Sequence, residues 1–332
     1  MRLNLPRLEG GRVKLSRRSA LAGAAALSAA PLARAQDFPS KPIKIVVPFA
    51  PGSATDIAGR GLANKLQEIL KQPVVVDDKP GASGQLGATI VATSPADGYT
   101  LMFGTNSTNA ANIALFKKLS YDPEKDFAPI IRCTIGVNAL VINNDLPIKS
   151  VAELIDYAKK NPGKLNYSEA SSSQRLSGEI FNQLAGVKIE RVPYKASPQA
   201  LADVNSGQVQ MMFPDLPQAL TQIEAGRVRG LAVTSAKRTP IVPDMPAIAE
   251  TVPGYSLVYW QAIFAPAGTP KPIQQKLHDA ILEAIKDPAT AKAMTQGRTE
   301  IAPLGLDEFT AYVKKETKWW TKAVKDAGIE PE

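Results

Sequence analysis

The sequence of 332 residues has few of the side chains that metal sites and nucleophilic enzymes require. A single cysteine, Cys133, and a single histidine, His278, leave too little for an internal disulfide, a zinc cluster or most Ser/His/Asp triads. Cys133 lies in an apolar run that predicts a buried thiol, and His278 lies in a polar helical stretch. No P-loop, G-x-S-x-G or H-E-x-x-H motif occurs. We therefore expect no metal, no cofactor and no catalytic residue. We expect that the protein is not an enzyme.

The net charge of +8 does not indicate a nucleic-acid-binding surface, because most of it lies at one end of the chain. The first 35 residues contain seven basic residues and one acidic residue, Glu9, whereas the remainder contains 32 basic and 30 acidic residues. We therefore expect no nucleic-acid partner. Contents of 44% hydrophobic and 21% charged residues exclude a disordered chain, and the length suggests two domains.

The N-terminal segment has the three parts of an export signal. A basic region runs to Arg18, an apolar stretch covers Ala20–Ala30, and Ala33–Ala35 is a small-x-small cleavage site. This pattern predicts a signal peptide over residues 1–35, cleaved after Ala35. Ser16–Arg18 favours the twin-arginine route, with the general secretory route as the alternative. No later stretch has 18 consecutive apolar residues, so we expect the exported chain to be soluble.

Strand and helix patterns alternate along the rest of the chain. Ile43–Val47 predicts a buried strand, and a helix over Thr55–Lys71 follows with a capping-box pattern at Ser53 and Asp56. Further strands are expected over Val74–Val76, Tyr99–Phe103, Leu165–Ser168, a run ending at Val192, Val209–Phe213, Val228–Thr234 and Leu257–Phe264. Further helices are expected over Gly81–Thr93, Val151–Lys160, Gln174–Ala185, Pro198–Asn205, Leu216–Ala225 and from Pro272 and Leu306. The alternation predicts parallel α/β units that restart after Asp145, with two crossings between lobes, near Ile131–Asn138 and Tyr255–Phe264.

Four loops between strand ends and helix starts are rich in glycine and small hydroxyl residues: Ala50–Asp56, Gly81–Gly84, Gly104–Ser107 and Ser171–Ser173. Small side chains leave backbone N–H groups accessible, and the dipole of the following helix favours an anion. Each loop alone is also ordinary turn chemistry. Together, at equivalent positions in α/β units, they predict a site for a carboxylate or another small anion.

The same residues resemble the Bug/TctC-type family of periplasmic substrate-binding proteins, which are associated with tripartite tricarboxylate transporters. The matching segments extend in order over nearly the whole chain after the signal: Lys41–Asp56, Gln72–Val76, Lys79–Ala82, Asp97–Leu101, Tyr121–Phe127, Val192–Lys195, Leu231–Ser235 and Ala265–Pro270. The resemblance implies an α/β, two-lobed periplasmic binding protein of type II-like fold, with two β-sheets flanked by helices and a ligand cleft between the lobes. Lobe 1 would comprise residues 36–135 and 258–332, and lobe 2 residues 136–257.

In this family, loops opening each lobe hold the carboxylates of the ligand, which here implies Phe49–Thr55 and Ser168–Arg175. Many members have a longer glycine-rich loop ending in histidine where this chain has Ser171–Arg175. Arg175 could pair with a second carboxylate, or be a solvated residue of the first helical turn. The candidate ligand-binding residues are Phe49, Ala50, Gly52, Ser53, Thr55, Ser83, Thr105, Asn106, Ser107, Ser168, Ser171, Ser172, Ser173, Arg175, Tyr194 and Asp215.

The resemblance implies a monomeric periplasmic receptor that binds a dicarboxylate, tricarboxylate or aromatic acid. Its partners would be the ligand and the membrane permease subunits of a tripartite tricarboxylate transporter. Two alternatives remain: a partner that presents the ligand to a sensor kinase, and a periplasmic enzyme using the same loops. The enzyme lacks a plausible base, because no histidine or paired carboxylate stands near these loops.

Overall fold

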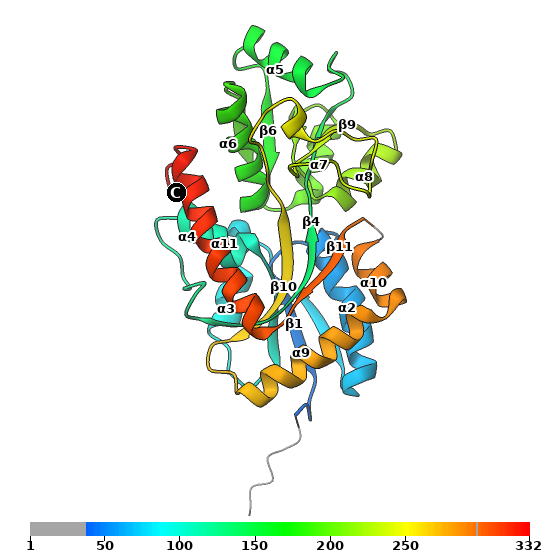
Figure 1. Ribbon diagram of the computed structural model, residues 1–332, viewed down its shortest axis with the longest axis vertical. Helices are drawn as coiled ribbons and strands as arrows, with labels where there is room; N and C mark the ends of the chain where they lie inside the picture. The colour runs from blue at the N-terminus through cyan, green and yellow to red at the C-terminus, as the bar shows by residue number, and fades with distance from the viewer. Residues whose placement is uncertain (1–37, 297) are drawn as a thin grey trace, which may run out of the picture. The chain divides into compact units, whose positions relative to one another are not determined.

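The computed structural model describes residues 38–296 and 298–332, so the predicted signal peptide and its cleavage site lie outside the described residues. Pro39–Glu332 forms one unit that contains two mixed β-sheets with helices packed around them (Figure 1). The six-stranded sheet has the order β11-β4-β10-β3-β1-β2. Its strands are β1 Ile43–Val47, β2 Val74–Asp78, β3 Thr100–Thr105, β4 Phe127–Gly136, β10 Tyr259–Pro266 and β11 Glu300–Leu304.

The first half of the six-stranded sheet consists of parallel α/β units. β1 pairs in parallel with β2 and β3, and helix α2, Ala54–Leu70, connects β1 to β2. Ser53 caps this helix, because its side chain accepts a hydrogen bond from the Asp56 N–H at 3.2 Å. The Asp56 carboxylate accepts from the Gly52 N–H at 2.8 Å, one residue before the position that a strict capping box would use. The N-terminus of α2 is thereby fixed at the carboxyl end of β1.

The centre of this sheet is β10, which pairs antiparallel with both β3 and β4. All eight of its residues are buried, and the Trp260 ring lies edge-on to Phe309 of helix α11, Leu306–Asp326, with 5.8 Å between ring centroids. β10 therefore joins the C-terminal helix to the core of the sheet. The remaining helices beside this sheet are η2 Ala82–Gly84, α3 Gln85–Ala92, η3 Ser107–Ala111, α4 Asn112–Leu115, α9 Lys271–Lys286, α10 Pro288–Thr295 and α11 Leu306–Asp326.

The five-stranded sheet has the order β7-β6-β8-β5-β9 and its own hydrophobic core. Its strands are β5 Ala139–Asn143, β6 Asn166–Glu169, β7 Glu190–Pro193, β8 Met211–Met212 and β9 Val228–Val233. Its helices are α5 Val151–Lys160, α6 Ser172–Ala185, α7 Ser197–Asn205, α8 Leu216–Glu224 and η4 Ile248–Glu250. β6 pairs in parallel with β7 and β8, so α6 and α8 begin after neighbouring parallel strands.

The chain passes from the six-stranded to the five-stranded sheet between Gly136 and Ala139, and it returns between Val233 and Tyr259. These passages lie near the predicted crossings, while the lobe boundaries themselves stay a prediction. Asn138, within the first passage, forms an isolated antiparallel bridge with Asp215, the residue before α8. One connection between the sheets is therefore tied to the start of a helix in the five-stranded sheet.

The structure corrects the predicted elements in several places. The sheets are mixed, because β10 is antiparallel to its neighbours and β5 is antiparallel to β8 and β9. Neither β4 nor β5 was among the predicted strands, because Ile131–Asn138 was interpreted only as a crossing between lobes. Helix α10 and the edge strand β11 were not predicted either, and β11 contains Pro303 and no fully buried residue. Within residues 38–296 and 298–332, none of the helices combines the length and the hydropathy that a membrane span requires.

Candidate functional site

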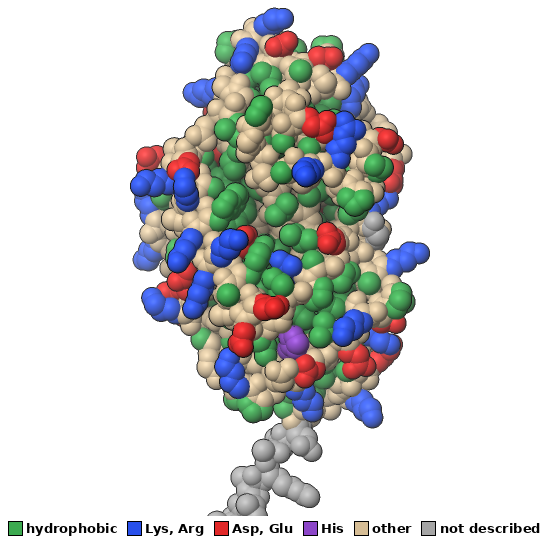
Figure 2. Space-filling view, in the orientation of Figure 1, with side chains coloured by type: hydrophobic (Ala, Val, Ile, Leu, Met, Phe, Trp, Pro, Cys, Tyr) green, Lys and Arg blue, Asp and Glu red, His purple; other side chains and the backbone are tan. Residues whose placement is uncertain are grey.

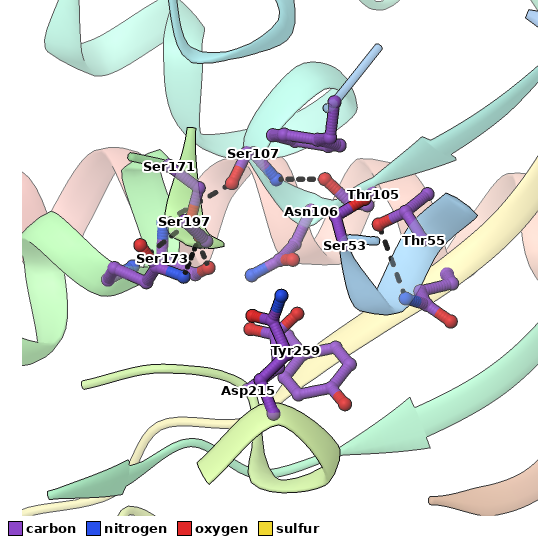
Figure 3. A pocket seen from close by; sticks show the side chains of 14 residues that line it. Ser53, Thr55, Thr105, Asn106, Ser107, Ser171, Ser173, Ser197, Asp215 and Tyr259 are labelled. Atoms are coloured by element: carbon purple, nitrogen blue, oxygen red, sulfur yellow. Dashed lines mark hydrogen bonds between the residues drawn. The ribbon is translucent and has the colours of Figure 1, made fainter. Parts of the chain in front are cut away.

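A small, polar pocket lies where loops from both sheets meet (Figure 3). Its lining is polar and almost entirely uncharged, with loop and helix-start residues from each sheet and two residues of β10. The lining residues are Phe49, Ser53, Thr55, Thr105, Asn106, Ser107, Ser171, Ser173, Gln174, Ser197, Asp215, Gln218, Tyr259 and Gln261.

On the side of the six-stranded sheet, the N-terminus of α2 faces the pocket. Ser53 is its N-cap, and Thr55 belongs to its first turn. The Thr55 hydroxyl accepts a hydrogen bond from the Gln261 amide at 3.3 Å, and the Gln261 carbonyl oxygen accepts from Thr134 at 3.0 Å. α2 has 17 residues, so its dipole adds positive potential at this end. This side of the pocket therefore attracts an anion without a cationic side chain.

The loop after β3 contributes the most informative residue, Asn106. Its neighbours bond to each other, because the Ser107 N–H donates to the Thr105 hydroxyl at 3.1 Å. Asn106 has no exposed surface, yet neither its amide nitrogen nor its amide oxygen has a hydrogen-bond partner. Figure 3 shows its side chain directed into the pocket. Buried amides are almost always paired, so Asn106 offers one donor group and one acceptor to a ligand.

On the side of the five-stranded sheet, the N-terminus of α6 supplies hydroxyl and amide groups. Ser171 caps α6 by accepting from the Gln174 N–H at 3.4 Å, and its hydroxyl lies 3.1 Å from that of Ser173. The Gln174 side chain accepts from the Ala170 N–H and donates to the Ser197 hydroxyl, both at 2.8 Å. These groups are held by one another, so they are oriented before any ligand binds.

Three hydrogen bonds join the two sides of the pocket. The Ser173 N–H donates to the Ser107 hydroxyl at 3.2 Å, and the Ser172 hydroxyl donates to the Asn112 side chain at 2.5 Å. At the rim, the Gln218 amide donates to the Gly52 carbonyl at 3.1 Å. The loops of both sheets are therefore in contact around the pocket.

Asp215 is the one carboxylate that lines the pocket, and no lysine, arginine or histidine lines it. Burial raises the pKa of Asp215 to about 6, while hydrogen bonds from the Asn138 and Gln174 amides act in the opposite direction. Burial also raises the pKa of the Tyr259 phenol, and the charge of Asp215 adds to that shift. On the face in view, Figure 2 shows basic and acidic side chains interspersed. Among the described residues, no group of three or more His, Cys, Asp or Glu side chains could hold a metal ion.

Several predicted site residues line the pocket, and the others do not. Those that line it are Phe49, Ser53, Thr55, Thr105, Asn106, Ser107, Ser171, Ser173 and Asp215. The Ser168 hydroxyl donates to the Ala200 carbonyl, and the Tyr194 hydroxyl donates to Asp203 at 2.6 Å. Ser172 and Gly52 take part in the contacts between the two sides, and the Ser83 carbonyl accepts from Asn112. Ala50 does not line the pocket, although its carbonyl accepts from the Ser53 N–H.

Arg175, expected either to pair with a second carboxylate of the ligand or to be a solvated residue of the first helical turn, does not line the pocket. Its guanidinium forms an ion pair with Glu332, with 3.2 Å between Nη1 and Oε1, and the side chain is buried. The physical reason is helical rotation. Successive side chains of a helix differ by about 100°, so Gln174 faces the pocket while Arg175 faces away.

Five lining residues were not predicted: Gln174, Ser197, Gln218, Tyr259 and Gln261. Gln174, Ser197 and Gln218 lie in the first turns of α6, α7 and α8, so the strand-to-helix rule that selected the serine loop could have included them. Tyr259 and Gln261 are alternate residues of β10 and share one face of the strand. The presence of Gln261 in an otherwise apolar strand could have indicated that this face of β10 lines a polar pocket.

The chain is similar to proteins of known family and known structure. Residues 58–329 match the tripartite tricarboxylate transporter family receptor, TctC. BugT of Bordetella pertussis is 33% identical, over 90% of this chain and 93% of that protein. A Rhodopseudomonas palustris protein solved with adipate is 38% identical with a TM-score of 0.86, covering 89% of this chain and all of that one. MatC of the same organism, solved with malate, is 31% identical with a TM-score of 0.81, covering 86% of this chain and all of that one. The chain therefore belongs to the TctC family of solute receptors.

Proposed function

We propose that this receptor binds a small carboxylate in the pocket between its two sheets and delivers it to a tripartite tricarboxylate-type membrane transporter. The observation that carries the proposal is Asn106, a fully buried amide that is directed into the pocket and has no partner. A carboxylate would accept from its nitrogen, and a hydroxyl or protonated group would donate to its oxygen. The related proteins solved with adipate and malate support this class of ligand.

The donors around Asn106 suit an anion of low molecular weight. The N-termini of α2 and α6 approach from opposite sides and contribute backbone dipoles, while Ser171, Ser173 and Thr55 contribute hydroxyls. No cation lines the pocket, so we expect affinity to depend only weakly on salt. The pocket also has no histidine or cysteine, which supports a binding role without catalysis.

Ligand binding would hold the two sheets together. The Ser173 to Ser107 and Gln218 to Gly52 hydrogen bonds cross the pocket, so separation of the two sides would open it. We propose that residues 36–135 with 258–332, and residues 136–257, move as two lobes about the passages at Asn138 and before Tyr259. The family supports a periplasmic location. Removal of residues 1–35 on export is part of the proposal and rests on the sequence pattern alone.

A thermal-shift screen against a library of carboxylic acids tests the proposal. A ligand at 100 times its dissociation constant should add about 2.7 kcal/mol of stability, or roughly 5–10 °C in Tm. For the best ligand, Asn106→Ala should weaken binding about ten- to a hundredfold, the effect of losing a hydrogen bond to a charged group.

The matched control is Asn144→Ala, an exposed asparagine outside the pocket whose amide donates to the Gly226 carbonyl. It should bind the ligand as the wild type does. Equal affinities for wild type and Asn106→Ala, measured by calorimetry, would place the site elsewhere. A steep fall in affinity between low and high salt would mean that a cationic side chain holds the ligand.

A further inference from the structure

Asp215 places a carboxylate in a pocket that otherwise suits an anion. It precedes α8, and one of its oxygens, Oδ1, accepts from the Asn138 amide at 3.0 Å. The same amide nitrogen donates to the Phe213 carbonyl at 2.8 Å, which fixes its direction. Backbone pairing between Asn138 and Asp215 adds a further constraint. Asp215 is therefore held at the pocket wall by the connection between the sheets.

No cation compensates this carboxylate. Asp215 forms no ion pair with any residue in the described part of the chain, and no basic side chain lines the pocket with it. A ligand carboxylate beside an ionised Asp215 would be repelled, because like charges interact strongly where water is excluded. The ligand must therefore present something other than a negative charge to Asp215.

We propose that Asp215 selects carboxylates that also carry a hydroxyl or ammonium group, which donates a hydrogen bond to it. This inference rests on the proposed function and specifies its ligand. Figure 3 shows Asn106 and Asp215 on opposite sides of the pocket. A ligand could thus place its carboxylate at Asn106 and the helix N-termini, and its donor group at Asp215.

The surroundings favour a donor on the ligand over a proton on Asp215. The groups that face Asp215 are the Asn138 amide from the β4–β5 connection, the Gln174 amide from α6 and the Tyr259 phenol from β10. Both amides stabilise the ionised form, and the pKa of about 6 leaves Asp215 an acceptor at neutral pH. Arg298, which contacts the Pro217 carbonyl in the first turn of α8, is paired with Glu224.

The test compares acids that share a carbon skeleton and differ in one group. Calorimetry at pH 8 measures succinate, malate and aspartate binding to the wild type and to Asp215→Asn. The five-carbon series glutarate, 2-hydroxyglutarate and glutamate covers a longer pocket, and the skeleton that binds best is the one compared. The wild type should bind the hydroxy or amino acid at least about tenfold tighter than the unsubstituted acid, equivalent to about 1.4 kcal/mol.

In Asp215→Asn this preference should fall below about threefold, with weaker binding of the substituted acid and tighter binding of the unsubstituted acid. The control Asp203→Asn removes a carboxylate that accepts from Tyr194 outside the pocket, and it should keep the full preference. Comparing the hydroxy acid with the amino acid shows whether a hydroxyl or an ammonium group donates to Asp215. Circular dichroism and Tm establish that each variant is folded, and Asp215→Ser repeats the test with a smaller neutral side chain.

A pH series separates the inference from its rival. For each ligand, the wild-type affinity is divided by the Asp215→Asn affinity at the same pH, which removes the effect of the ligand's own titration. For a hydroxy or amino acid, this affinity ratio should fall as the pH decreases through about 6. Preference for the unsubstituted acid, strengthening at low pH, would overturn the inference and make protonated Asp215 the donor. Failure of every carboxylic acid to bind the wild type would instead overturn the proposed function.

Discussion

Replacing Asp215 by asparagine should make the unliganded protein more stable above neutral pH. Burial raises the pKa of Asp215 from 3.8 to about 6, so the folded chain binds more protons than the unfolded chain between these values. The contribution of this group to stability is therefore complete below about pH 4 and is lost as pH rises through 6. The difference between a pKa of 3.8 and a pKa of about 6 corresponds to ~3 kcal/mol. Asp215 is only partly buried, so we expect about 1–2 kcal/mol after screening by solvent.

The assay is urea or thermal unfolding of wild type and Asp215→Asn between pH 4 and pH 8, after unfolding and refolding to remove bound ligand. The variant should match the wild type near pH 4 and exceed it at pH 8, by roughly 2–6 °C in Tm. The substituted side chain would still present an amide oxygen to Asn138, so the hydrogen bond itself is not lost. Parallel pH curves for the two proteins, or a variant that is less stable at pH 8, would refute the reasoning.

Two further predictions concern helix α6. Gly178→Ala would place a Cβ atom 2.4 Å from Cε2 of the buried Tyr167 ring. We therefore expect urea unfolding to show ~1–3 kcal/mol of destabilisation. An unchanged unfolding midpoint would contradict this packing. Arg175→Ala should lower stability by ~1–2 kcal/mol, because it leaves Glu332 and the buried Glu169 with fewer cationic partners. Its ligand affinity, measured by calorimetry, should stay within about threefold of wild type; a tenfold loss with unchanged stability would assign Arg175 to the binding site.

The elements that the sequence predicts well are those whose local pattern and tertiary environment agree. β1 was predicted over Ile43–Val47 and α5 over Val151–Lys160, and the structure has these bounds. In α5, Ser150 caps the helix through the Glu153 N–H, and the buried Val151, Leu154 and Ala158 lie on one face. Both signals are local, so the sequence alone contains them.

The features that were missed depend on distant parts of the chain. β11 is an edge strand that exists because β4 lies beside it, and its own residues show little alternation. Tyr259 and Gln261 reach the pocket because β10 lies between β3 and β4, which no local pattern indicates. The ion-pair partner of Arg175, Glu332, lies 157 positions later in the sequence, so no local pattern indicates that this side chain is buried. Loop composition predicted pocket residues in the loops between strands and helices. It could not predict pocket residues such as Tyr259 and Gln261, whose position depends on the order of the strands in the sheet.

The placement of charge around α6 shows how a receptor that we propose binds an anion can have a pocket without cations. Arg175 and Arg191 lie behind the serine loop, where both pair with Glu332 and Arg191 also pairs with Glu169. A guanidinium in the empty pocket would be a desolvated charge without a partner, and an unpaired buried charge costs several kcal/mol. Hydroxyls and amides can instead bond to one another in the empty pocket, as Gln174 does with Ser197, and turn to the ligand when it binds. Asp215 departs from this arrangement, because no cationic side chain lines the pocket beside its carboxylate. A buried carboxylate without a partner is also costly, so the ligand must supply a hydrogen-bond donor to Asp215.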